Sequence, residues 1–291
     1  MCTAVSVWGK RHLFGRTLDL SHTYGEAVVL TPRHFPLAGV GETHHVLLGV
    51  AHLFGGEPLY YDAVNEHGLC GAALHFPGET VYGEREEGKL AIPSYALISY
   101  VLGLAKTVEE VKELLQCAVI TGEPVDDALP TAPLHWIFAD RQGAVTVESV
   151  KTGLMVYDNP VGVLTNPPEF PRQLVLLGER GLQGDLSSVT RFGRAAFYKT
   201  RTVVGDNAEE AVRDFFHLMA TVSVPKGAVC TAEGDVPCTQ YTACADTSTG
   251  AYFYTTYGCP RIRAVTLRDK NLDGDTLFTT PLTRAVDVLY Q

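Results

Sequence analysis

The sequence of 291 residues is poor in cysteine, and the placement of its cysteines excludes some common frameworks. There are seven, an odd number, spread from position 2 to position 259 without a C-x-x-C pair. This pattern predicts neither a disulfide framework nor a structural zinc site. We expect six of them to be buried as small apolar residues. Cys2 is the exception, because it directly follows the initiator Met1.

Positive charge and long apolar runs are also scarce. Lysine and arginine total 23 against 33 acidic residues, so the net charge at pH 7 is −10. This charge argues against nucleic acid or an anionic membrane as the main partner. Lys10, Arg11, Arg16 and Asp19 interrupt the first twenty residues, so we expect no signal peptide and no membrane anchor. We predict a cytoplasmic protein.

Several catalytic and metal-binding motifs are missing. The chain has no G-x-S-x-G, no phosphate-binding P-loop, no G-x-G-x-x-G and no H-E-x-x-H. The stretch 269–275 is similar to the first half of an EF-hand loop, but its twelfth position is Thr280 where a glutamate is needed, which favours a polar turn. Adjacent side chains on a strand point to opposite faces, so His44 and His45 are not expected to share a metal ion. We predict neither a metal nor a cofactor.

The pattern of apolar residues predicts blocks of strands that alternate with pairs of helices. Thr107 with Glu110, and Asn207 with Glu210, have the spacing of helix N-terminal caps. This order indicates an α+β fold in which helices cover antiparallel sheets, with one domain over residues 1–291. The expected strands are 3–8, 12–14, 27–30, 45–50, a pair around 64–69, several within 134–165, then 240–245, 251–257 and 261–267; the expected helices are 93–104, 107–117, 187–203 and 207–222.

Cys2 has chemical potential of its own. Removal of Met1 would leave a thiol and a free α-amine on one residue, a nucleophile and a base together. We expect Arg16 and Asp19 at the edge of a nearby hairpin, where Asp19 would accept a hydrogen bond from the amine and Arg16 would stabilise the thiolate. The simpler interpretation of this pair is a salt bridge at the end of a strand, and the simpler interpretation of Cys2 is an exposed thiol in a non-catalytic or redox-sensing protein.

Nine segments, in order along almost the whole chain, carry a family resemblance. They are Met1–Thr3, Gly15–Asp19, Thr31–Arg33, Asn65–Leu69, Phe76–Gly78, Leu134–Trp136, Gly162–Asn166, Gly184–Phe192 and Gln240–Thr242. The set resembles the choloylglycine hydrolase family, which contains bile salt hydrolases and penicillin V acylases. The resemblance implies an N-terminal-nucleophile hydrolase, with two antiparallel sheets between layers of helices in an αββα sandwich.

The resemblance also implies roles for particular residues. Cys2 matches the nucleophile, Arg16 and Asp19 match groups around it, Asn166 matches a side-chain donor to the oxyanion, and Arg191 matches the arginine beside the nucleophile. The implied substrate is a small amphipathic amide, a glycine- or taurine-conjugated bile acid. Five residues are candidates for its apolar pocket from their position: Leu20, Phe54, Tyr60, Leu129 and Leu134.

Two departures from the family pattern leave alternatives open. His75 stands before Phe-Pro-Gly, where bile salt hydrolases usually have asparagine and penicillin V acylases often have tyrosine; its backbone N–H is expected to contribute to the oxyanion hole. An acylase for penicillin V or N-acyl homoserine lactones is therefore the alternative function. Asn166 and Arg191 are 25 positions apart, where many family members have a long hairpin used in tetramer assembly. We expect a homo-oligomer without assuming a tetramer.

Overall fold

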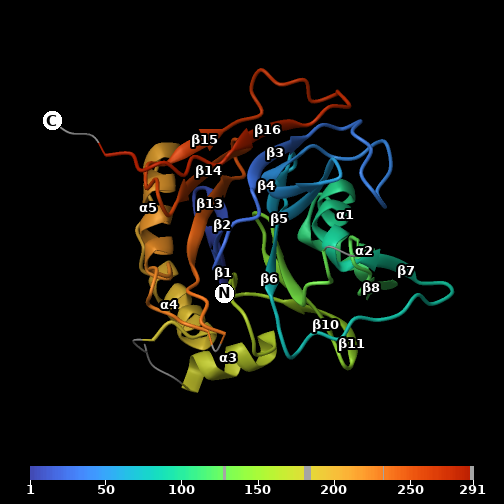
Figure 1. Cartoon of the computed structure of the whole chain (residues 1–291), viewed down its shortest axis with the longest axis horizontal. Helices are drawn as coiled ribbons and strands as arrows, with labels where there is room; N and C mark the ends of the chain where they lie inside the picture. The colour runs from blue at the N-terminus through green and yellow to red at the C-terminus, as the bar shows by residue number, and fades with distance from the viewer. Residues whose placement is uncertain (127–128, 180–184, 232, 289–291) are drawn as a thin grey trace.

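The computed structural model describes residues 1–126, 129–179, 185–231 and 233–288, and its main feature is a pair of facing β-sheets (Figure 1). The first sheet has six strands in the order β12-β1-β2-β13-β14-β15, and the second has eight in the order β11-β10-β9-β6-β5-β4-β3-β16. Neighbouring strands in both sheets are antiparallel.

The bounds of the strands follow the sheets. The first sheet contains β1 (Cys2–Trp8), β2 (His12–Leu20), β12 (Val163–Leu164), β13 (Cys238–Asp246), β14 (Ala251–Thr256) and β15 (Arg263–Val265). The second contains β3 (Ala27–Thr31), β4 (Leu47–Phe54), β5 (Glu57–Asn65), β6 (Cys70–His75), β9 (Leu134–Ala139), β10 (Ala144–Val150), β11 (Gly153–Asp158) and β16 (Phe278–Pro281). A small parallel pair is formed by β7 (Leu90–Pro93) and β8 (Ala118–Thr121).

Helices cover the outer face of each sheet. On the first sheet lie α4 (Ser188–Lys199) and α5 (Ala208–Ala220), and α3 (Phe170–Glu179) packs beside α4. On the second sheet lie α1 (Leu97–Leu104) and α2 (Val108–Leu115), with a short 3₁₀ turn, η1 (Ser94–Ala96), before α1. Figure 1 shows the four layers edge-on, with α4 and α5 on one side and α1 and α2 on the other. The expected arrangement of antiparallel sheets between helices is confirmed.

Two apolar cores hold these layers together. One joins the facing sheets and continues under α3, α4 and α5, and it includes Cys2, Leu18 and Phe192. The other lies between the second sheet and α1 and α2, and it includes Tyr60 and Trp136. Burial of apolar surface on this scale is the main favourable contribution to folding. No helix of the described residues is both long and apolar enough to cross a lipid bilayer.

The helix N-terminal caps predicted from the sequence are present in the structure at α2 and α5. The Thr107 side chain accepts from the backbone N–H of Glu110 at the start of α2, and the Asn207 side chain accepts from that of Glu210 at the start of α5. Such caps satisfy N–H groups that have no partner within the helix. The helix expected from residue 93 begins instead as η1, and Pro93 ends β7.

Helix α3 and strand β8 were not expected. The backbone N–H of Phe170, at the start of α3, donates to the buried carboxylate of Glu148, which lies 22 positions earlier on β10. The residues around 170 show no cap of their own, so only the tertiary structure supplies one. In the same way β8 is defined by its pairing with β7, which leaves little trace in a four-residue apolar segment.

The EF-hand-like stretch 269–275 is a loop that docks on Arg33. The backbone N–H of Arg33 donates to the Leu272 carbonyl, and its Nη1 donates to Asp273 at 2.5 Å. Asp273 is thus already paired with a cation. The arrangement agrees with the interpretation of this stretch as a polar turn.

Candidate functional site

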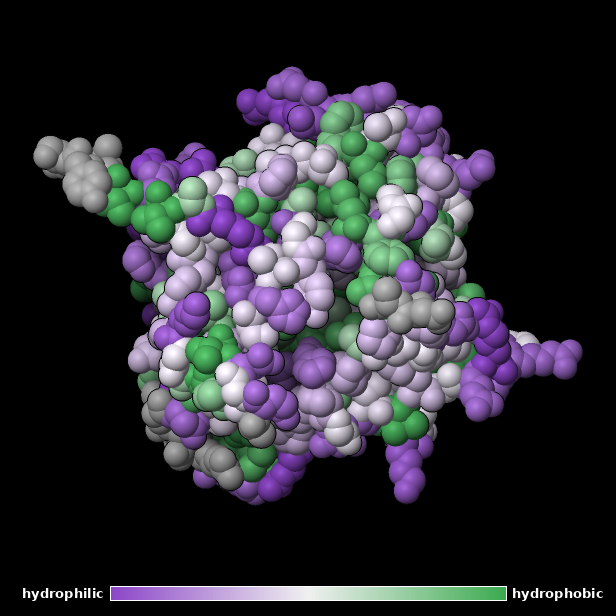
Figure 2. Space-filling model, viewed as in Figure 1, coloured by the Kyte–Doolittle hydropathy of each residue, from purple (hydrophilic) through white to green (hydrophobic). Residues whose placement is uncertain are grey.

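Cys2 is the first residue of β1 and is buried. In the antiparallel ladder Cys2 lies opposite Leu18, and Ala4 lies opposite Arg16 on β2. Cross-strand partners and alternate residues share a face, so the Cys2 and Arg16 side chains lie on the same face of the first sheet. Figure 2 shows a hollow near the middle of the molecular face, where Figure 1 marks the N-terminus, with some apolar surface in its wall.

Arg16 is fully buried and reaches the second sheet. Its Nη1 donates to the backbone carbonyls of Ala73, at 2.7 Å, and Tyr61, at 3.1 Å. Its Nη2 has no hydrogen-bond partner among the described residues. Burial opposes its charge, but the negative charges of Cys2, Tyr241 and Asp62 outweigh burial and raise the pKa of the guanidinium. A permanent cation therefore faces the region of the Cys2 thiol.

Asn166 connects several parts of the site. Its Oδ1 accepts from the backbone N–H of Cys2 at 2.8 Å and from Nη2 of Arg191 at 2.7 Å. Its Nδ2 donates to the backbone carbonyl of His75 at 2.6 Å. The side chain thus joins the start of β1 to the end of β6, and its orientation is fixed from both sides.

Arg191, on α4, supports the same corner from the helical layer. It is fully buried, and its Nη1 donates to the Cys2 carbonyl at 2.5 Å and to Oγ1 of Thr3 at 2.6 Å. Burial lowers the pKa of this guanidinium, and the charges of Asp19 and Cys2 act in the opposite direction. Arg191 on α4 therefore holds the segment that contains Cys2, and Arg16 on β2 is a second buried cation near it.

Asp19 occupies a position that differs from expectation in two ways. β2 lies between β1 and β13, so Arg16 and Asp19 are buried within the sheet and not at a hairpin edge, and they do not form a salt bridge with each other. The Asp19 carboxylate accepts from the hydroxyls of Thr239, at 2.6 Å, and Thr17, at 3.3 Å. With Met1 in place, it is the backbone carbonyl of Asp19 that accepts from the terminal ammonium, at 2.8 Å.

His75 ends β6 beside Asn166, and its imidazole is exposed. Partial desolvation, and then the positive N-terminus, lower its pKa. The neighbouring His135 is buried, stacks on Phe76 with ring centres 4.0 Å apart, and makes hydrogen bonds to Glu148 and to the Thr165 carbonyl. His135 therefore braces the residue before Asn166, a role that the local sequence did not indicate.

Sequence reasoning missed other residues that hold Asn166. Oγ of Ser188 accepts from the Asn166 backbone N–H at 2.9 Å and donates to its carbonyl at 2.7 Å. Nε2 of Gln173, on α3, donates to the same carbonyl at 2.8 Å. Ser188 lies within the segment that carries the family resemblance, but Gln173 lies on the unexpected helix α3 and had no signal of its own.

The five candidate pocket residues are not brought together as a group. Tyr60 is wrong as a pocket residue, because its side chain lies in the core beneath α1 and α2 and its hydroxyl contacts Oγ1 of Thr31 at 2.7 Å. Leu134 packs against the same core. Leu20 packs against the core between the sheets, Phe54 ends β4, and Leu129 lies in the loop between β8 and β9.

The neighbour of Tyr60 is the tyrosine that faces the site. Side chains alternate along a strand, so Tyr61 points to the opposite face and packs against the core between the sheets. Burial raises the pKa of the Tyr61 hydroxyl, and the charges of Glu26 and Cys2 act in the same direction. The sequence predicted neither the strand β5 over these residues nor the face on which Tyr60 lies, since Tyr60 was a candidate from its position only.

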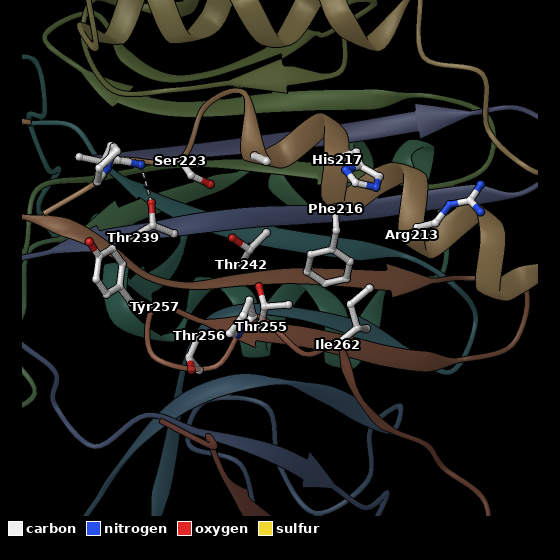
Figure 3. Close-up of a pocket in the computed structure, with 14 residues that line it drawn as sticks. Arg213, Phe216, His217, Ser223, Thr239, Thr242, Thr255, Thr256, Tyr257 and Ile262 are labelled. Carbon is white, nitrogen blue, oxygen red and sulfur yellow. Dashed lines mark hydrogen bonds between the residues drawn. The ribbon is translucent and has the colours of Figure 1, made fainter. Parts of the chain in front are cut away.

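Cavities among the described residues include three of about 500, 720 and 420 Å³, and Cys2 lines none of these three. The cavity of about 500 Å³ lies on the outer face of the first sheet; Figure 3 shows Phe216, from α5, pointing toward Thr255 of β14. Thr239 lines it and also donates to Asp19. This cavity therefore adjoins Asp19, on the face of the sheet opposite the Cys2 side chain.

Comparison with known proteins assigns the chain to a family. A family model described as linear amide C–N hydrolases, choloylglycine hydrolase family, matches residues 2–179 and 176–280. The chain belongs to the choloylglycine hydrolase family. It is a hydrolase of linear amide C–N bonds.

Relatives of this choloylglycine hydrolase family member match it over nearly its whole length. The bile salt hydrolase/transferase of Lactiplantibacillus plantarum is 37% identical, over 97% of this chain and 97% of the relative. The solved structure of a mutant conjugated bile acid hydrolase from Clostridium perfringens is 30% identical, with a TM-score of 0.92, over 100% of this chain and 99% of that one.

A third solved structure shows how widely the fold is shared. Penicillin V acylase from Agrobacterium tumefaciens is 23% identical, with a TM-score of 0.80, over 96% of this chain and 90% of that one. At this identity the likeness concerns the fold alone. The αββα sandwich of N-terminal-nucleophile hydrolases is thus the fold of this family member.

Proposed function

We propose that this protein hydrolyses the amide bond of glycine- or taurine-conjugated bile acids, with Cys2 as the nucleophile after removal of Met1. The observation that carries the proposal is the hydrogen bond from the Cys2 backbone nitrogen to Oδ1 of Asn166, 2.8 Å long. Removal of Met1 turns this nitrogen into the α-amine of Cys2. Asn166 would then hold the amine beside the thiol of the same residue.

In the proposed reaction, the α-amine accepts the thiol proton and the Cys2 sulfur attacks the carbonyl carbon of the amide. A carbon–sulfur bond forms, and the carbonyl oxygen becomes an oxyanion. The amine returns the proton to the amide nitrogen as the C–N bond breaks, which releases glycine or taurine and leaves a thioester. Water, deprotonated by the same amine, then attacks the thioester and releases the bile acid with the free thiol.

Asn166 is suited to stabilise the oxyanion. Its amide has two N–H groups, of which one donates to the His75 carbonyl. The second is free to donate to the developing negative charge, in a site where hydrogen bonds around Oδ1 fix the amide in advance. Arg16 and Arg191 assist by stabilising negative charge on the sulfur, since both are buried cations close to Cys2.

The choice of substrate rests on the relatives and on charge. Two relatives, from Lactiplantibacillus plantarum and Clostridium perfringens, carry the name bile salt hydrolase/transferase, at 37% and 32% identity over almost the full chain. A conjugated bile acid is an anion, whereas this protein has a net charge of −10. Binding must therefore come from burial of the apolar steroid and from local cations such as Arg16.

We further propose that the enzyme acts in the cytoplasm as a homo-oligomer. All seven cysteines are free, and Cys117 and Cys230 are exposed, so the expectation that every cysteine except Cys2 is buried is wrong for these two. Exposed free thiols suit a reducing compartment. Light scattering coupled to size-exclusion chromatography would give the oligomer size, and a monomer at every concentration tested would contradict the second half of this proposal.

The test combines intact-mass analysis with variants. We expect the purified protein to lack Met1. Cys2→Ser should lower glycine release from glycocholate by roughly a thousand-fold or more, whereas Cys117→Ser, which removes an exposed thiol, should leave it unchanged. Retention of Met1 on active protein, or unchanged turnover by Cys2→Ser, would contradict the proposal that processed Cys2 is the nucleophile.

The substrate claim needs a separate measurement. Values of kcat/KM for glycocholate, taurocholate, penicillin V and an N-acyl homoserine lactone should be highest for one of the bile acid conjugates. A preference for penicillin V or the lactone would keep the nucleophile and overturn the substrate. A protein with processed Cys2 that cleaves none of the four amides would leave the non-catalytic thiol interpretation.

A further inference from the structure

Two histidines and a glutamate lie together at the end of the second sheet far from Cys2. His45 precedes β4, and Glu66 and His67 form part of the turn between β5 and β6. Their ligand atoms all lie within 4.8 Å of one another. Within the described ranges, no other group of three or more His, Cys, Asp and Glu side chains is this close. These three residues are called the histidine cluster below.

The two imidazoles have the separation that a shared metal ion requires. Nε2 of His67 is 3.2 Å from Nδ1 of His45, and the ring planes are inclined by 79°. Two nitrogens bound tetrahedrally to zinc at about 2.0–2.1 Å lie about 3.3 Å apart. In the structure these two nitrogens form a hydrogen bond, so one ring carries a proton between them, and an ion that replaces this proton needs little movement of either ring.

The backbone around the histidine cluster is fixed before any ion binds. The Asn65 side chain accepts from the N–H groups of His67 and Leu69 and donates to the carbonyls at the end of α1. The His45 N–H donates to the Gly103 carbonyl at 2.9 Å. Because folding already fixes the backbone of these residues, zinc binding would cost little further conformational entropy.

The hydrogen bonding of the His45 ring is also that expected of a metal ligand. The His45 ring makes a hydrogen bond to the backbone carbonyl of Leu104, and a carbonyl can only accept, so the ring presents an N–H there and a lone pair at its other nitrogen. A neutral imidazole is the form that binds metal.

We propose that His45, Glu66 and His67 form a binding site for a zinc ion. The two imidazoles supply nitrogen ligands, and Glu66 supplies an oxygen, which leaves a fourth position for water. Arg33 donates to both carboxylate oxygens of Glu66, and the Val46 N–H donates to one of them, so the carboxylate is oriented as well as charged.

Bound zinc would join two segments of the second sheet. It would link the chain entering β4 to the β5–β6 turn, next to the ion pair of Arg33 with Asp273. β6 separates the histidine cluster from His75, and its six residues span about 20 Å. The expected effect is therefore on stability and not on hydrolysis, and it does not depend on the proposed catalytic function.

The test is zinc titration of the chelator-treated full-length protein by calorimetry and thermal unfolding. We expect one zinc per chain and a rise in Tm of about 4 °C when free zinc is a hundred times Kd. His45→Gln and His67→Gln should each weaken binding by at least ten-fold. His34→Gln, which alters an exposed histidine outside the cluster, is the matched control. Glu66 is a poor test residue, because its loss would also break the Arg33 pair.

Free thiols are the competing zinc ligands, and cobalt distinguishes them. Cobalt bound at the histidine cluster should give visible bands without the near-ultraviolet charge-transfer band of a thiolate ligand, and both histidine variants should lose them. Absence of zinc binding by the parent protein would overturn the proposal. So would binding that persists in His45→Gln and His67→Gln or that disappears in Cys2→Ala.

Discussion

Nη2 of Arg191 donates a 2.7 Å hydrogen bond to Oδ1 of Asn166, the same oxygen that accepts from the Cys2 backbone. The contact joins helix α4 to the segment after β12, and through it to the first residue of β1. A guanidinium that also donates to the Cys2 carbonyl sets the distance between these groups. The helical layer thus takes part in the geometry around the nucleophile.

Arg191→Lys should disturb this geometry without removing the charge. A lysine cannot reproduce the fork that contacts the Cys2 carbonyl, Thr3 and Asn166, so kcat for glycocholate should fall about 100-fold. The free energy of unfolding should fall by about 2–4 kcal/mol, because buried acceptors lose their partner. Arg201→Lys, on the exposed surface after α4, should change neither quantity; a fully active Arg191→Lys enzyme would contradict the role.

Asp62→Asn should change the pH dependence of the reaction. Burial raises the pKa of Asp62, and Arg16 and the hydroxyls of Tyr241 and Tyr252, which both donate to its carboxylate, act against this rise. The asparagine would remove negative charge next to Arg16 and so strengthen the positive field at Cys2. Protonation of the thiolate and amine becomes less favourable, and the acidic limb of the kcat/KM profile should move to lower pH.

A fall in stability alone would not move that limb, so the pH profile separates the two effects of Asp62→Asn. Asp206→Asn, which alters an exposed carboxylate paired with Lys10, is the control and should leave the profile in place. An acidic limb that stays where it is, or moves to higher pH, would contradict the electrostatic role of Asp62.

Features encoded by neighbouring residues could be predicted from the sequence. Thr107 and Asn207 cap α2 and α5, and the strand blocks give the layers of the sandwich. The resemblance to choloylglycine hydrolases selected Cys2, Arg16, Asn166 and Arg191 before the fold was known, and the structure brings these four together. Their catalytic roles remain proposals.

Features that depend on distant pairing could not be predicted. The sequence predicts that β2 lies at the edge of a hairpin. In the structure β2 also pairs with β13, more than two hundred residues later in the chain, so Arg16 and Asp19 lie inside the sheet. The sequence also could not show which face of β5 each tyrosine occupies, because Tyr60 and Tyr61 have the same side chain. The pairing of β5 with its neighbouring strands decides that Tyr61 points toward Cys2 and Tyr60 away from it. His45 meets His67 through the same kind of pairing.

His12 should make folding sensitive to acid. Its ring is buried between the hydroxyls of Ser6 and Thr247, and burial lowers its pKa to about 4. The unfolded chain takes up a proton near pH 6.5, whereas the folded protein does so only near 4, so stability is lost as pH falls through this interval. The loss approaches about 3 kcal/mol at pH 4.

Urea unfolding at several values between pH 7 and pH 4 would measure this loss. His12→Gln should be less stable at pH 7 but should show a shallower decline toward pH 4, because glutamine does not titrate. His52, which is only half-buried, is the control, and His52→Gln should keep the slope of the parent protein. Parallel curves for the parent and His12→Gln would show that other groups cause the acid sensitivity.

Gly15→Ala should damage both the fold and the site. Gly15 lies on β2 directly before Arg16, and a Cβ there would be 1.9 Å from the Ala243 carbonyl oxygen and 2.9 Å from the Phe215 ring. The backbone of β2 or β13 must move, at a cost of about 3 kcal/mol or more. Because Arg16 and Asp19 lie on the displaced strand, hydrolysis of glycocholate should fall as well. Gly143→Ala places its Cβ in open space and should change the free energy of unfolding by less than about 0.5 kcal/mol. A Gly15→Ala protein with the parent's midpoint would mean that β2 and β13 tolerate separation here and that glycine at this position serves another purpose.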